Sequence, residues 1–477
     1  MKKKLIIIGL ALVLFWAIFL RLYYISDQSV WMDEAYSLAI AQDIVEQGYP
    51  LAGSGEVVWR SPMYHFLLAG ATYFRGDAIL AGRLLSVLLG IATIIVISII
   101  AKYWFSNRVA IITFVVMSFS YWEIAWSRQV RMYMLLQLLF WLALFLYDCW
   151  LQGKKKLLIW MMIITILTIM THQFGYLVIF AFILLVVIKK LFNSSLKPGY
   201  LVTIFVSTIL GMIISSVILV RIFFYNGPLV NYWNHYSNYI MNEQLALIIL
   251  AVFGIWLLIK RGKVEQALWL SAIFLVGFGV LSYAVPLLHY RYLFFLFPAV
   301  VMLTAVAVDW LLSRSYLGWA VVVIFTVAYS GFVFLPQSNY ALESDSNDSY
   351  LSYKSFTPQP DFKSAYEFLS NQQVDALITP YPAITRLYST NLDDYSLYVD
   401  PTGRDDIMPE REIYTGVEYI DAETFEKMNI GEKNVYVLID TLAKYRLSNS
   451  LLEMIEESKQ VYRTDSGPWS ELILYRL

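Results

Sequence analysis

Cysteine, glycine, proline and charge are all scarce in this sequence, and each shortage excludes a class of protein. The 477 residues include one Cys, 14 Pro and 23 Gly, which excludes disulfide scaffolds, collagen-like repeats and Pro/Gly-rich disordered chains. The single Cys149 lies inside a long apolar run, so neither a disulfide nor a cysteine-based metal site is expected. Charged residues make up 15% of the chain, whereas an ordinary soluble protein has about 25%.

What the chain has instead is apolar sequence. Hydrophobic residues make up 59% of the total, against about 45–50% in soluble domains. A helix crosses a bilayer with about 20 apolar residues, and helices are expected because lipid offers no partner for free backbone groups. The sequence therefore predicts a polytopic α-helical membrane protein with about eleven spans, at 5–24, 78–101, 109–126, 132–151, 157–171, 173–188, 199–222, 243–260, 265–284, 292–312 and 316–335.

The formal net charge of −1 hides two halves of opposite sign. Residues 1–335 contain 23 Lys/Arg and 12 Asp/Glu, a net of +11, whereas residues 336–477 contain 12 Lys/Arg and 24 Asp/Glu, a net of −12. With the N-terminal lysines in the cytoplasm, alternation of the spans puts every compact basic cluster on the cytoplasmic side, as the positive-inside rule requires. These clusters are Lys2–Lys4, Lys102 with Arg108, Lys154–Lys156, Lys189–Lys190, Lys260–Arg261 with Lys263, and Arg314.

This charge pattern predicts a multi-pass protein of the cell membrane with a cytoplasmic N-terminus. The first span is longer than the apolar core of a typical signal peptide and no cleavage site follows it, so it is expected to remain as an anchor. An odd number of spans places the acidic tail on the extracytoplasmic side.

The tail, residues 336–477, is predicted to be a separate soluble α/β domain after a membrane domain of residues 1–335. Helical patterns alternate with short β-rich runs, which favours this class, and 142 residues are enough for an independent core. No phosphate loop, metal motif or nucleophile constellation is present in it. The expected elements are helices at 361–372, 421–428 and 448–458, an apolar run at 374–379, an alternating stretch at 411–419, and strands at 434–440 and 471–475.

The segment between the first two spans, residues 25–77, is too long and too aromatic for a simple connector. It holds seven of the twelve acidic residues of the membrane half. Stretches 34–47 and 61–74 have amphipathic helical spacing and are expected to lie on the membrane interface. Asp33-Glu34 follows the first span closely, so a carboxylate there is expected to have a raised pKa or a cationic partner, and it is well placed for general-base catalysis on a hydroxyl. Acidic pairs are also common on ordinary surfaces.

Five arginines are predicted on the same extracytoplasmic side as this loop, although the positive-inside rule disfavours arginine there. Guanidinium groups match phosphate oxygens, so the five together predict a cationic pocket for a lipid phosphate. For any one of them, snorkelling or pairing with a nearby acid is the alternative. His172 and His289 fit hydrogen-bonded interfacial residues better than metal ligands. The predicted phosphate-binding set is Arg60, Arg83, Arg128, Arg131 and Arg291, and further substrate contacts are predicted at Tyr64, Tyr133, His172, His289 and Tyr292.

Four ordered stretches carry a family resemblance. After the Asp-Glu pair come R-S-P-M-Y-H-F-L-L, A-G-R-L-L-S-V-L-L-G, S-R-Q-V-R-M-Y and R-Y-L-F-F-L-F-P. In this order they resemble the GT-C superfamily of membrane glycosyltransferases, and within it the protein mannosyltransferase and aminoarabinose transferase-like group (glycosyltransferase family 39 and relatives). The resemblance covers residues 1–335 and leaves the tail outside.

The resemblance implies an inverting transfer of a sugar from a polyprenyl-phosphate donor to a protein, lipid or glycan acceptor at the outer face of the membrane. It implies that Asp33 is the catalytic base with Glu34 as its neighbour, and that Arg128, Arg131 and Arg291 contact the donor phosphate. Arg60 falls where relatives carry a basic residue before a Pro-Pro-Leu-Tyr stretch. Two departures concern donor geometry: Gln129 stands where an acid is frequent, and Ser61 replaces the first of the paired prolines. The Trp-Trp-Asp signature of oligosaccharyltransferases is absent, which argues against transfer of a preassembled glycan to Asn.

Two other function classes remain open. A transporter or flippase of a lipid-linked substrate is expected to carry ionisable residues near the bilayer midplane, whereas Asp148 and Asp309 lie toward cytoplasmic span ends and Glu123 toward an outer end. A membrane-anchored scaffold accounts for the tail but not for the outer arginines. No spacing demands a cofactor, although a divalent metal is compatible with the sequence, and nothing indicates a nucleic-acid partner.

Overall fold

The structure is a computed structural model that describes residues 2–74, 76–193, 230–285, 289–314, 318, 334–336, 360–389, 393–397, 411–420, 425, 434–464 and 471–477. The chain forms two compact units. Unit 1 comprises residues 1–23, 86–128 and 132–340, and unit 2 comprises residues 24–85, 129–131 and 341–477. Each unit is described by itself.

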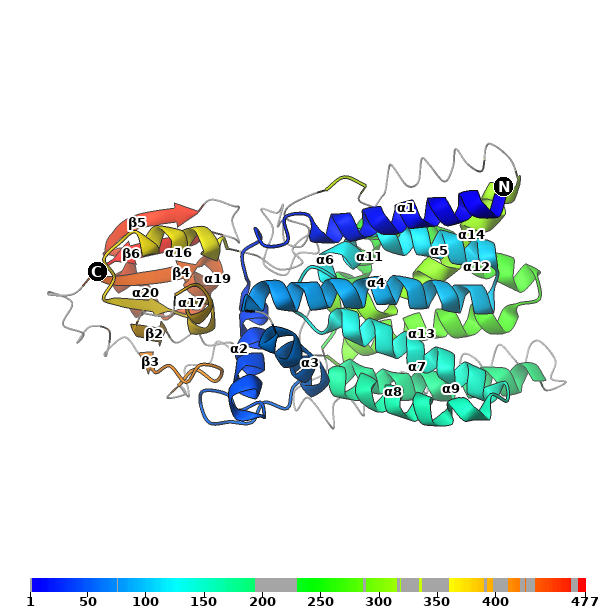
Figure 1. Ribbon diagram of the computed structural model, residues 1–477, viewed down its shortest axis with the longest axis horizontal. Coiled ribbons are helices and arrows are strands. Elements are labelled where there is room, and N and C mark those ends of the chain that lie inside the picture. Colours follow the sequence, from blue (N-terminus) through cyan, green and yellow to red (C-terminus); the bar gives the residue numbers. More distant parts are fainter. Residues whose placement is uncertain are drawn as a thin grey trace. The chain divides into compact units, whose positions relative to one another are not determined.

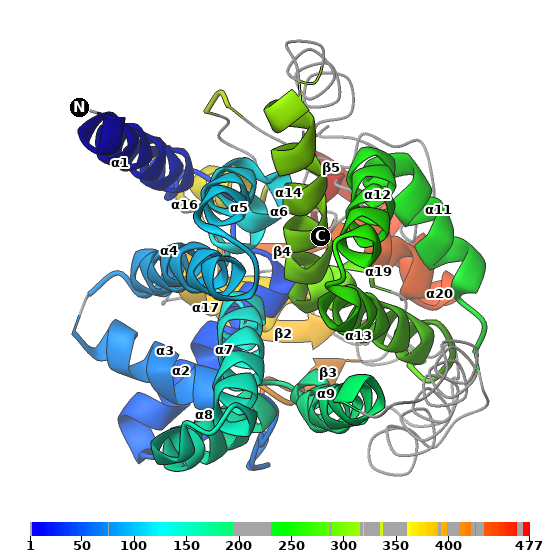
Figure 2. The same cartoon turned by 90° about the vertical axis from the view of Figure 1, so that its right-hand side faces the viewer.

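Unit 1 is a bundle of apolar helices, seen close to end on in Figure 2. Helices with at least 18 residues and high hydropathy form the spans Lys4–Leu22, Ala78–Trp104, Tyr133–Leu151, Gln173–Phe192, Val264–Tyr283 and Tyr290–Arg314, the second of which begins in unit 2. The helices of the bundle are α1 (Lys2–Leu22), α4 (Ala78–Trp104), α5 (Asn107–Phe119), α6 (Tyr121–Trp126), α7 (Tyr133–Leu151), η1 (Lys155–Leu157), α8 (Leu158–Thr171), η2 (Gln173–Tyr176), α9 (Leu177–Asn193), α11 (Trp233–Glu243), α12 (Leu245–Lys260), α13 (Val264–Tyr283), η3 (Tyr290–Leu296) and α14 (Phe297–Arg314).

Close backbone approach holds the centre of the bundle together. Gly254 of α12 faces the Leu303 carbonyl of α14, and a Cβ at Gly254 would clash with that carbonyl. About two turns earlier in α12, the Leu247 carbonyl accepts a 2.9 Å hydrogen bond from the hydroxyl of Thr304, the residue after Leu303. In lipid, small residues and side-chain hydrogen bonds bring helices together. Apolar side chains contribute little hydrophobic driving force there, because the lipid tails are equally apolar.

The described residues confirm a multi-pass helical fold but not the count of eleven spans. Six helices pass as spans by length and composition, or seven if α11 and α12 count as one span bent by 92°. The predicted span 109–126 is broken at Ser120 into α5 and α6. The predicted span 157–171 corresponds to α8, whose 14 residues rise only about 21 Å. The predicted spans 199–222 and, almost entirely, 316–335 lie outside the described residues.

Unit 2 is built on a mixed six-stranded sheet of order β3-β2-β1-β4-β6-β5. Figure 1 labels five of these strands, all except β1, and the flanking helices. Strands β1 (Ala376–Thr379), β2 (Asp393–Leu397), β3 (Tyr419–Ile420) and β4 (Val435–Asp440) pair in parallel, and β5 (Lys459–Thr464) and β6 (Leu472–Arg476) add antiparallel pairs next to β4. The α/β character predicted for the tail is confirmed. Its helices are α16 (Phe362–Ser370), α17 (Pro382–Tyr388), α19 (Thr441–Arg446) and α20 (Asn449–Glu456).

Alternation along the strands gives the sheet two apolar faces. In β1, Leu377 joins one buried cluster with Phe362 and Ala365 of α16, while Ile378 joins the other with Leu451 and Ile455 of α20. Successive strand residues point to opposite faces, so both faces need a helical cover, and α16 with α17 and α19 with α20 provide it. The predicted helix at 421–428 lies outside the described residues except for Phe425.

The loop 25–77 contributes directly to this core. Its two expected amphipathic helices are present as α2 (Met32–Gln47) and α3 (Pro62–Tyr73). Val30 and Ala35, both fully buried, belong to the cluster that α16 and the sheet form, and the Tyr388 hydroxyl of α17 accepts a 2.9 Å hydrogen bond from the Val30 amide. Unit 2 therefore joins the tail and the first long loop in a single core.

Candidate functional site

The start of α2 carries the adjacent acids Asp33 and Glu34, and their side chains have different partners. Asp33 Oδ2 lies 3.2 Å from Arg131 Nη2, with both side chains less than one-fifth exposed. Arg131 Nη1 also donates to the Asp33 carbonyl at 2.8 Å and to the Ser37 hydroxyl at 2.9 Å, and its guanidinium lies 5.8 Å from the centre of the Trp31 ring. One arginine thus holds the first turn of α2 and supplies the cationic partner expected for Asp33.

Glu34 is fully buried and forms an ion pair with Arg83, at 3.1 Å between Oε2 and Nη2. Glu34 Oε1 accepts further hydrogen bonds from Arg83 Nε at 3.2 Å and from the Val130 amide at 2.8 Å. Arg83 also donates hydrogen bonds to the main-chain carbonyls of Ile25, Gln28 and Ser29. A charge in the protein interior needs such full pairing, so Glu34 and Arg83 fix the fold of the loop rather than face a ligand.

The packing of residues 129–131 and the start of α2 bring Asp33 and Glu34 to their arginine partners. The residues 129–131 belong to unit 2, where the Val130 side chain packs against Gly82 so closely that a Cβ at Gly82 would clash with it. Both acids lie in the first turn of α2, where the helix dipole favours negative charge. Neighbouring positions on a helix point about 100° apart, which separates an accessible acid from a buried one.

The start of α3 adds a neutral histidine next to Arg131. His65 is almost fully buried, and burial, followed by the charge of Arg131, lowers its pKa to about 3, while a hydrogen bond to the Arg60 backbone acts in the opposite direction. His65 therefore stays neutral at physiological pH. Arg60 itself is exposed in the turn before α3, and Tyr64 is fully buried.

The tail brings a tyrosine to this region, which the sequence did not indicate. The ring of Tyr414 stacks on that of Tyr36, one turn after Asp33, with 4.1 Å between the ring centres. Burial raises the pKa of the Tyr414 hydroxyl; the nearby charges of Arg60 and Arg131 oppose the rise and that of Asp33 adds to it. No local sequence pattern predicts a contact between Tyr36 and Tyr414, which are far apart in the chain. The sequence predicted only that Tyr414 belongs to an alternating stretch, residues 411–419.

The other predicted site residues belong to unit 1. Arg128 is fully buried and donates to the carbonyls of Leu20, Arg21 and Tyr23 at 3.2, 2.9 and 2.7 Å. These carbonyls lie at the end of α1, where the last turn of a helix leaves acceptors without intrahelical partners. Arg128 therefore caps α1.

Four predicted substrate contacts of unit 1 gather in an aromatic group. The ring centre of His172 lies 6.0 Å from that of Tyr133 and 6.2 Å from that of Tyr292, and the His289 ring lies 5.3 Å from Tyr292. His172 Nδ1 accepts from the Phe174 amide at 3.1 Å, which agrees with a hydrogen-bonded interfacial histidine. Arg291 is about one-tenth exposed, and its guanidinium lies 5.8 Å from the Tyr292 ring centre.

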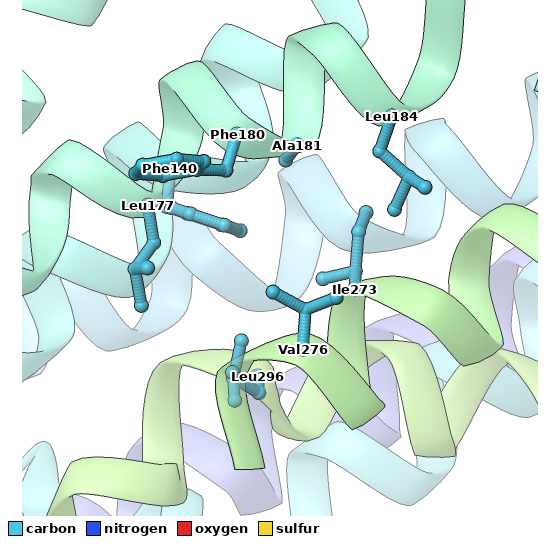
Figure 3. A pocket seen from close by; sticks show the side chains of 9 residues that line it. Phe140, Leu177, Phe180, Ala181, Leu184, Ile273, Val276 and Leu296 are labelled. Atoms are coloured by element: carbon cyan, nitrogen blue, oxygen red, sulfur yellow. The ribbon is translucent and has the colours of Figure 1, made fainter. Parts of the chain in front are cut away.

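A cavity in unit 1 offers no comparable chemistry. It lies between α7, α9 and α13, and Figure 3 shows its purely apolar lining, including Phe140, Leu177 and Ile273. Its volume of about 10 Å³ is about the room that one water needs. Among the described residues, no group of three or more His, Cys, Asp or Glu is placed to hold a metal ion.

Comparisons with known proteins agree with the sequence resemblance. The family model described as dolichyl-phosphate-mannose-protein mannosyltransferase matches residues 59–220, less than half of the chain. Among curated proteins there is no significant match.

Two kinds of solved structure share the fold. ArnT from Cupriavidus metallidurans bound to undecaprenyl phosphate matches with a TM-score of 0.61 and 13% identity, over 99% of this chain and 97% of that chain. The archaeal oligosaccharyltransferase AglB from Archaeoglobus fulgidus, in complex with an inhibitory peptide and a dolichol-phosphate, matches with a TM-score of 0.55 and 12% identity, over 98% of this chain and 74% of that chain. The resemblance to GT-C membrane glycosyltransferases is thereby confirmed, and at such low identity the solved structures show the fold.

Proposed function

We propose that this protein is an inverting glycosyltransferase that moves a sugar from a polyprenyl-phosphate donor to an acceptor hydroxyl at the outer face of the cell membrane. The single observation that carries the proposal is the Asp33–Arg131 pair at the start of α2. It combines a carboxylate of fixed orientation with a guanidinium in a chain that has the fold of lipid-phosphate-dependent transferases.

In the proposed reaction the acceptor oxygen attacks the anomeric carbon of the donor sugar from the face opposite the lipid phosphate. The bond between that carbon and the phosphate oxygen breaks, the lipid phosphate leaves with the bonding electrons, and Asp33 takes the proton of the acceptor hydroxyl. A single displacement of this kind inverts the configuration at the anomeric carbon. Asp33 is already aligned by Arg131 and by its place in the helix, so little reorganisation is needed.

Arginine serves the leaving group because its charge stabilises the phosphate dianion as it departs. Of the five predicted arginines, Arg83 and Arg128 are fully buried and use their donors on Glu34 and on main-chain carbonyls. We assign phosphate contact to Arg60 and Arg131 of unit 2 and a scaffold role to Arg83 and Arg128. Arg291, which belongs to unit 1, stays a predicted phosphate contact. Tyr64, Tyr133, His172, His289 and Tyr292 stay predicted substrate contacts.

The placement of charge in unit 1 favours an enzyme over a transporter. Asp309 pairs with Arg108 at 2.9 Å, and Lys189 bridges Asp148 at 3.0 Å and Glu265 at 2.7 Å. All five lie within the last or first two turns of their helices, whereas a transport pathway is expected to place ionisable residues near the bilayer midplane.

The experiment is transfer by the purified full-length protein from a set of labelled polyprenyl-phosphate sugars, with Asp33→Asn as the test variant. The amide cannot accept the proton, so the rate is expected to fall by about 10²–10⁴-fold. Asp27→Asn, which changes an exposed carboxylate of the same loop, is the matched control and keeps full activity. Full activity in Asp33→Asn excludes the base assignment, and protein-dependent movement of the lipid across the bilayer without transfer would establish the transporter instead.

A further inference from the structure

A polar cleft of about 380 Å³ lies in unit 2 between α2 and α17. This volume is within the range of about 300–1,000 Å³ typical of small-molecule sites. Its polar lining consists of Gln42, Asp43 and Glu46 from α2, Thr385, Arg386 and Ser389 at the end of α17, and Tyr414. The hydrogen bonds and the ion pair given above for Asp33 and Arg131 do not involve these side chains, and Tyr414 lies within electrostatic reach of both.

The cleft continues a stripe of α2 that starts beside Asp33. Tyr36, Ala39, Asp43 and Glu46 are spaced by three, four and three residues, which places them on the same face of a helix. Asp43 lies ten residues after Asp33, about 15 Å along the helix axis. A ligand that fills the cleft and reaches Asp33 must therefore be longer than a single sugar ring.

Asp43 presents an acceptor that the protein leaves unused. Its Oδ2 is buried and has no hydrogen-bond partner among the described residues. Burial, followed by the charge of Glu46, raises the pKa of Asp43 to about 6, and only Arg386 opposes the rise. A buried acceptor without a donor costs free energy, which a hydroxyl of a bound ligand recovers.

The neighbouring side chains make hydrogen bonds that orient them along the cleft. Gln42 Nε2 donates to Glu46 Oε1 at 2.8 Å, and Arg386 Nη2 donates to the Thr415 carbonyl at 2.7 Å. Tyr414 is fixed by its stack on Tyr36, so an aromatic face forms part of the wall. Such a ring offers apolar contact and a polar hydroxyl together.

We propose that this cleft binds the acceptor and that the acceptor is a neutral oligosaccharide or the glycan part of a glycolipid. This inference rests on the proposed function and names its acceptor class. Each sugar hydroxyl both donates and accepts hydrogen bonds, which matches a lining that mixes carboxylates, an amide, a hydroxyl and a guanidinium. Two carboxylates against one arginine disfavour an anionic phosphate, and Arg386 disfavours a cationic peptide.

The first test measures binding to the full-length protein in lipid nanodiscs, with an array of defined neutral oligosaccharides as probes. The wild type is expected to bind at least one member, and Asp43→Asn is expected to weaken that binding about tenfold, the effect of one hydrogen bond to a charged group. Ala39→Phe, which fills the cleft without changing its charge, is expected to weaken binding at least as much. Asp27→Asn is the matched control and binds like the wild type.

Each other outcome overturns the inference. A wild type that binds no glycan of the array, or cleft variants that bind as well as the wild type, exclude an oligosaccharide site. Binding of an oligolysine peptide that is lost in Asp43→Asn, or of inorganic phosphate that is lost in Ala39→Phe, assigns the cleft to a charged ligand instead. Size-exclusion profiles like that of the wild type and a single cooperative melting transition establish that the variants are folded.

A kinetic test separates this inference from the proposed function. With the glycan that binds, Asp43→Asn is expected to raise the acceptor KM about tenfold while kcat and the hydrolysis of the donor by water stay unchanged. Transfer by the wild type with an unchanged acceptor KM in the variant refutes the acceptor site but leaves the transferase intact. Absence of any transfer by the wild type refutes the transferase, while the binding result still decides whether the cleft takes a glycan.

Discussion

Glu34 and Asp33 are adjacent in the chain, but one is a buried partner of Arg83 and the other a partly accessible partner of Arg131. Removing one member of a buried ion pair typically costs about 3–5 kcal/mol, because the other charge stays without compensation. We therefore expect Glu34→Gln to destabilise unit 2 by about 3 kcal/mol, at the lower end because three carbonyls still accept from Arg83. Thermal unfolding of the purified protein in detergent measures the loss.

Asp33→Asn is the control for this change. The Asp33–Arg131 pair is less buried than the Glu34–Arg83 pair, so loss of its charge is expected to cost less than the about 3–5 kcal/mol typical of a buried pair. The melting temperature of Asp33→Asn should therefore fall less than that of Glu34→Gln, while its transfer activity is lost. Equal destabilisation by both variants would contradict the division of the acidic pair into a scaffold residue and a base.

The raised pKa of Asp43 predicts that the free energy of unfolding depends on pH. Its pKa rises from 3.8 in the unfolded chain to about 6 in the fold, so the folded state binds the proton more tightly. The stabilisation from the protonated carboxyl is complete below pH 3.8 and is lost as the pH rises through about 6. Asp43→Asn has no charge to desolvate and should be more stable than the wild type above this range, by about 1 kcal/mol because solvent screens the partly exposed group.

Melting temperatures of the two proteins from pH 4 to pH 8 check this prediction, with the difference expected to shrink toward the acidic end. The groups that face Asp43 are Glu46, which adds to the rise in pKa, and Arg386, which opposes it. Asp27→Asn should show no such trend, because Asp27 is exposed. A stability difference that is independent of pH would show that the carboxyl of Asp43 is not desolvated in the fold.

At the scale of elements, two turns of unit 2 are joined by backbone hydrogen bonds, and we call this pair of turns the clasp. The turn at residues 51–57, closed by a bridge between Leu51 and Val57, contacts the turn at residues 411–418, closed by a bridge between Arg411 and Glu418. The Gly53 amide donates to the Tyr414 carbonyl at 3.1 Å, and the next amide donates to the Ile413 carbonyl at 3.1 Å. This clasp holds Tyr414 against Tyr36 and thereby shapes the wall of the polar cleft.

Gly53→Ala should open the clasp. A Cβ at Gly53 would clash with the main chain of Thr415 and Gly416, and neither can move as a flexible side chain would. Overpacking of this kind costs about 1–3 kcal/mol, and we expect faster hydrogen exchange in residues 411–418 and weaker acceptor binding. Gly70→Ala is the control: nothing lies within 4 Å of its Cβ, and alanine favours a helix interior by about 1 kcal/mol. Unchanged exchange in Gly53→Ala would contradict the clasp.

The elements were predicted unevenly, for physical reasons. Apolar runs and amphipathic spacing are local signals, so the helices α1, α2, α3, α4, α7 and α13 and the strands β1, β4 and β6 occur within a few residues of the expected positions. Hydropathy did not reveal the break at Ser120, because apolar residues continue on both sides of it. It also gave no sign of the bend between α11 and α12. The strands β2 and β5 carry charged or polar residues at sheet positions and gave no strand pattern.

The candidate site was predictable in composition but not in pairing. Asp33, Glu34, Arg83 and Arg131 were all expected to matter, and the alternative of an arginine paired with a nearby acid describes Arg83. Which arginine takes which acid depends on how residues 129–131 fold into unit 2, and no spacing along the chain encodes that. The same holds for Tyr414, which meets Tyr36 only through the tertiary fold.

At the scale of the whole molecule, the acidic tail is more than an appended module, because the first loop of the membrane half shares its core. Fully buried Val30 and Ala35 pack with Phe362, Leu377 and the rest of that cluster. The opposite charges of the two halves therefore do not mark two independent folding domains. The loop that carries the proposed base folds together with the tail.

This shared core predicts that deletion of residues 340–477 abolishes transfer while the membrane half still inserts. Without the tail, the apolar faces of Val30, Ala35 and Tyr36 lose their cover, at about 25 cal/mol per Å² of apolar surface exposed to water, and the start of α2 is no longer fixed. Proteolysis should then cut within residues 28–44, most of which are buried in the intact protein. Co-expression of residues 340–477 as a separate chain is the control and should restore part of the protection. A deleted protein that inserts correctly, resists cleavage in this loop and keeps unchanged kinetics with every acceptor would show that the tail is dispensable for the site.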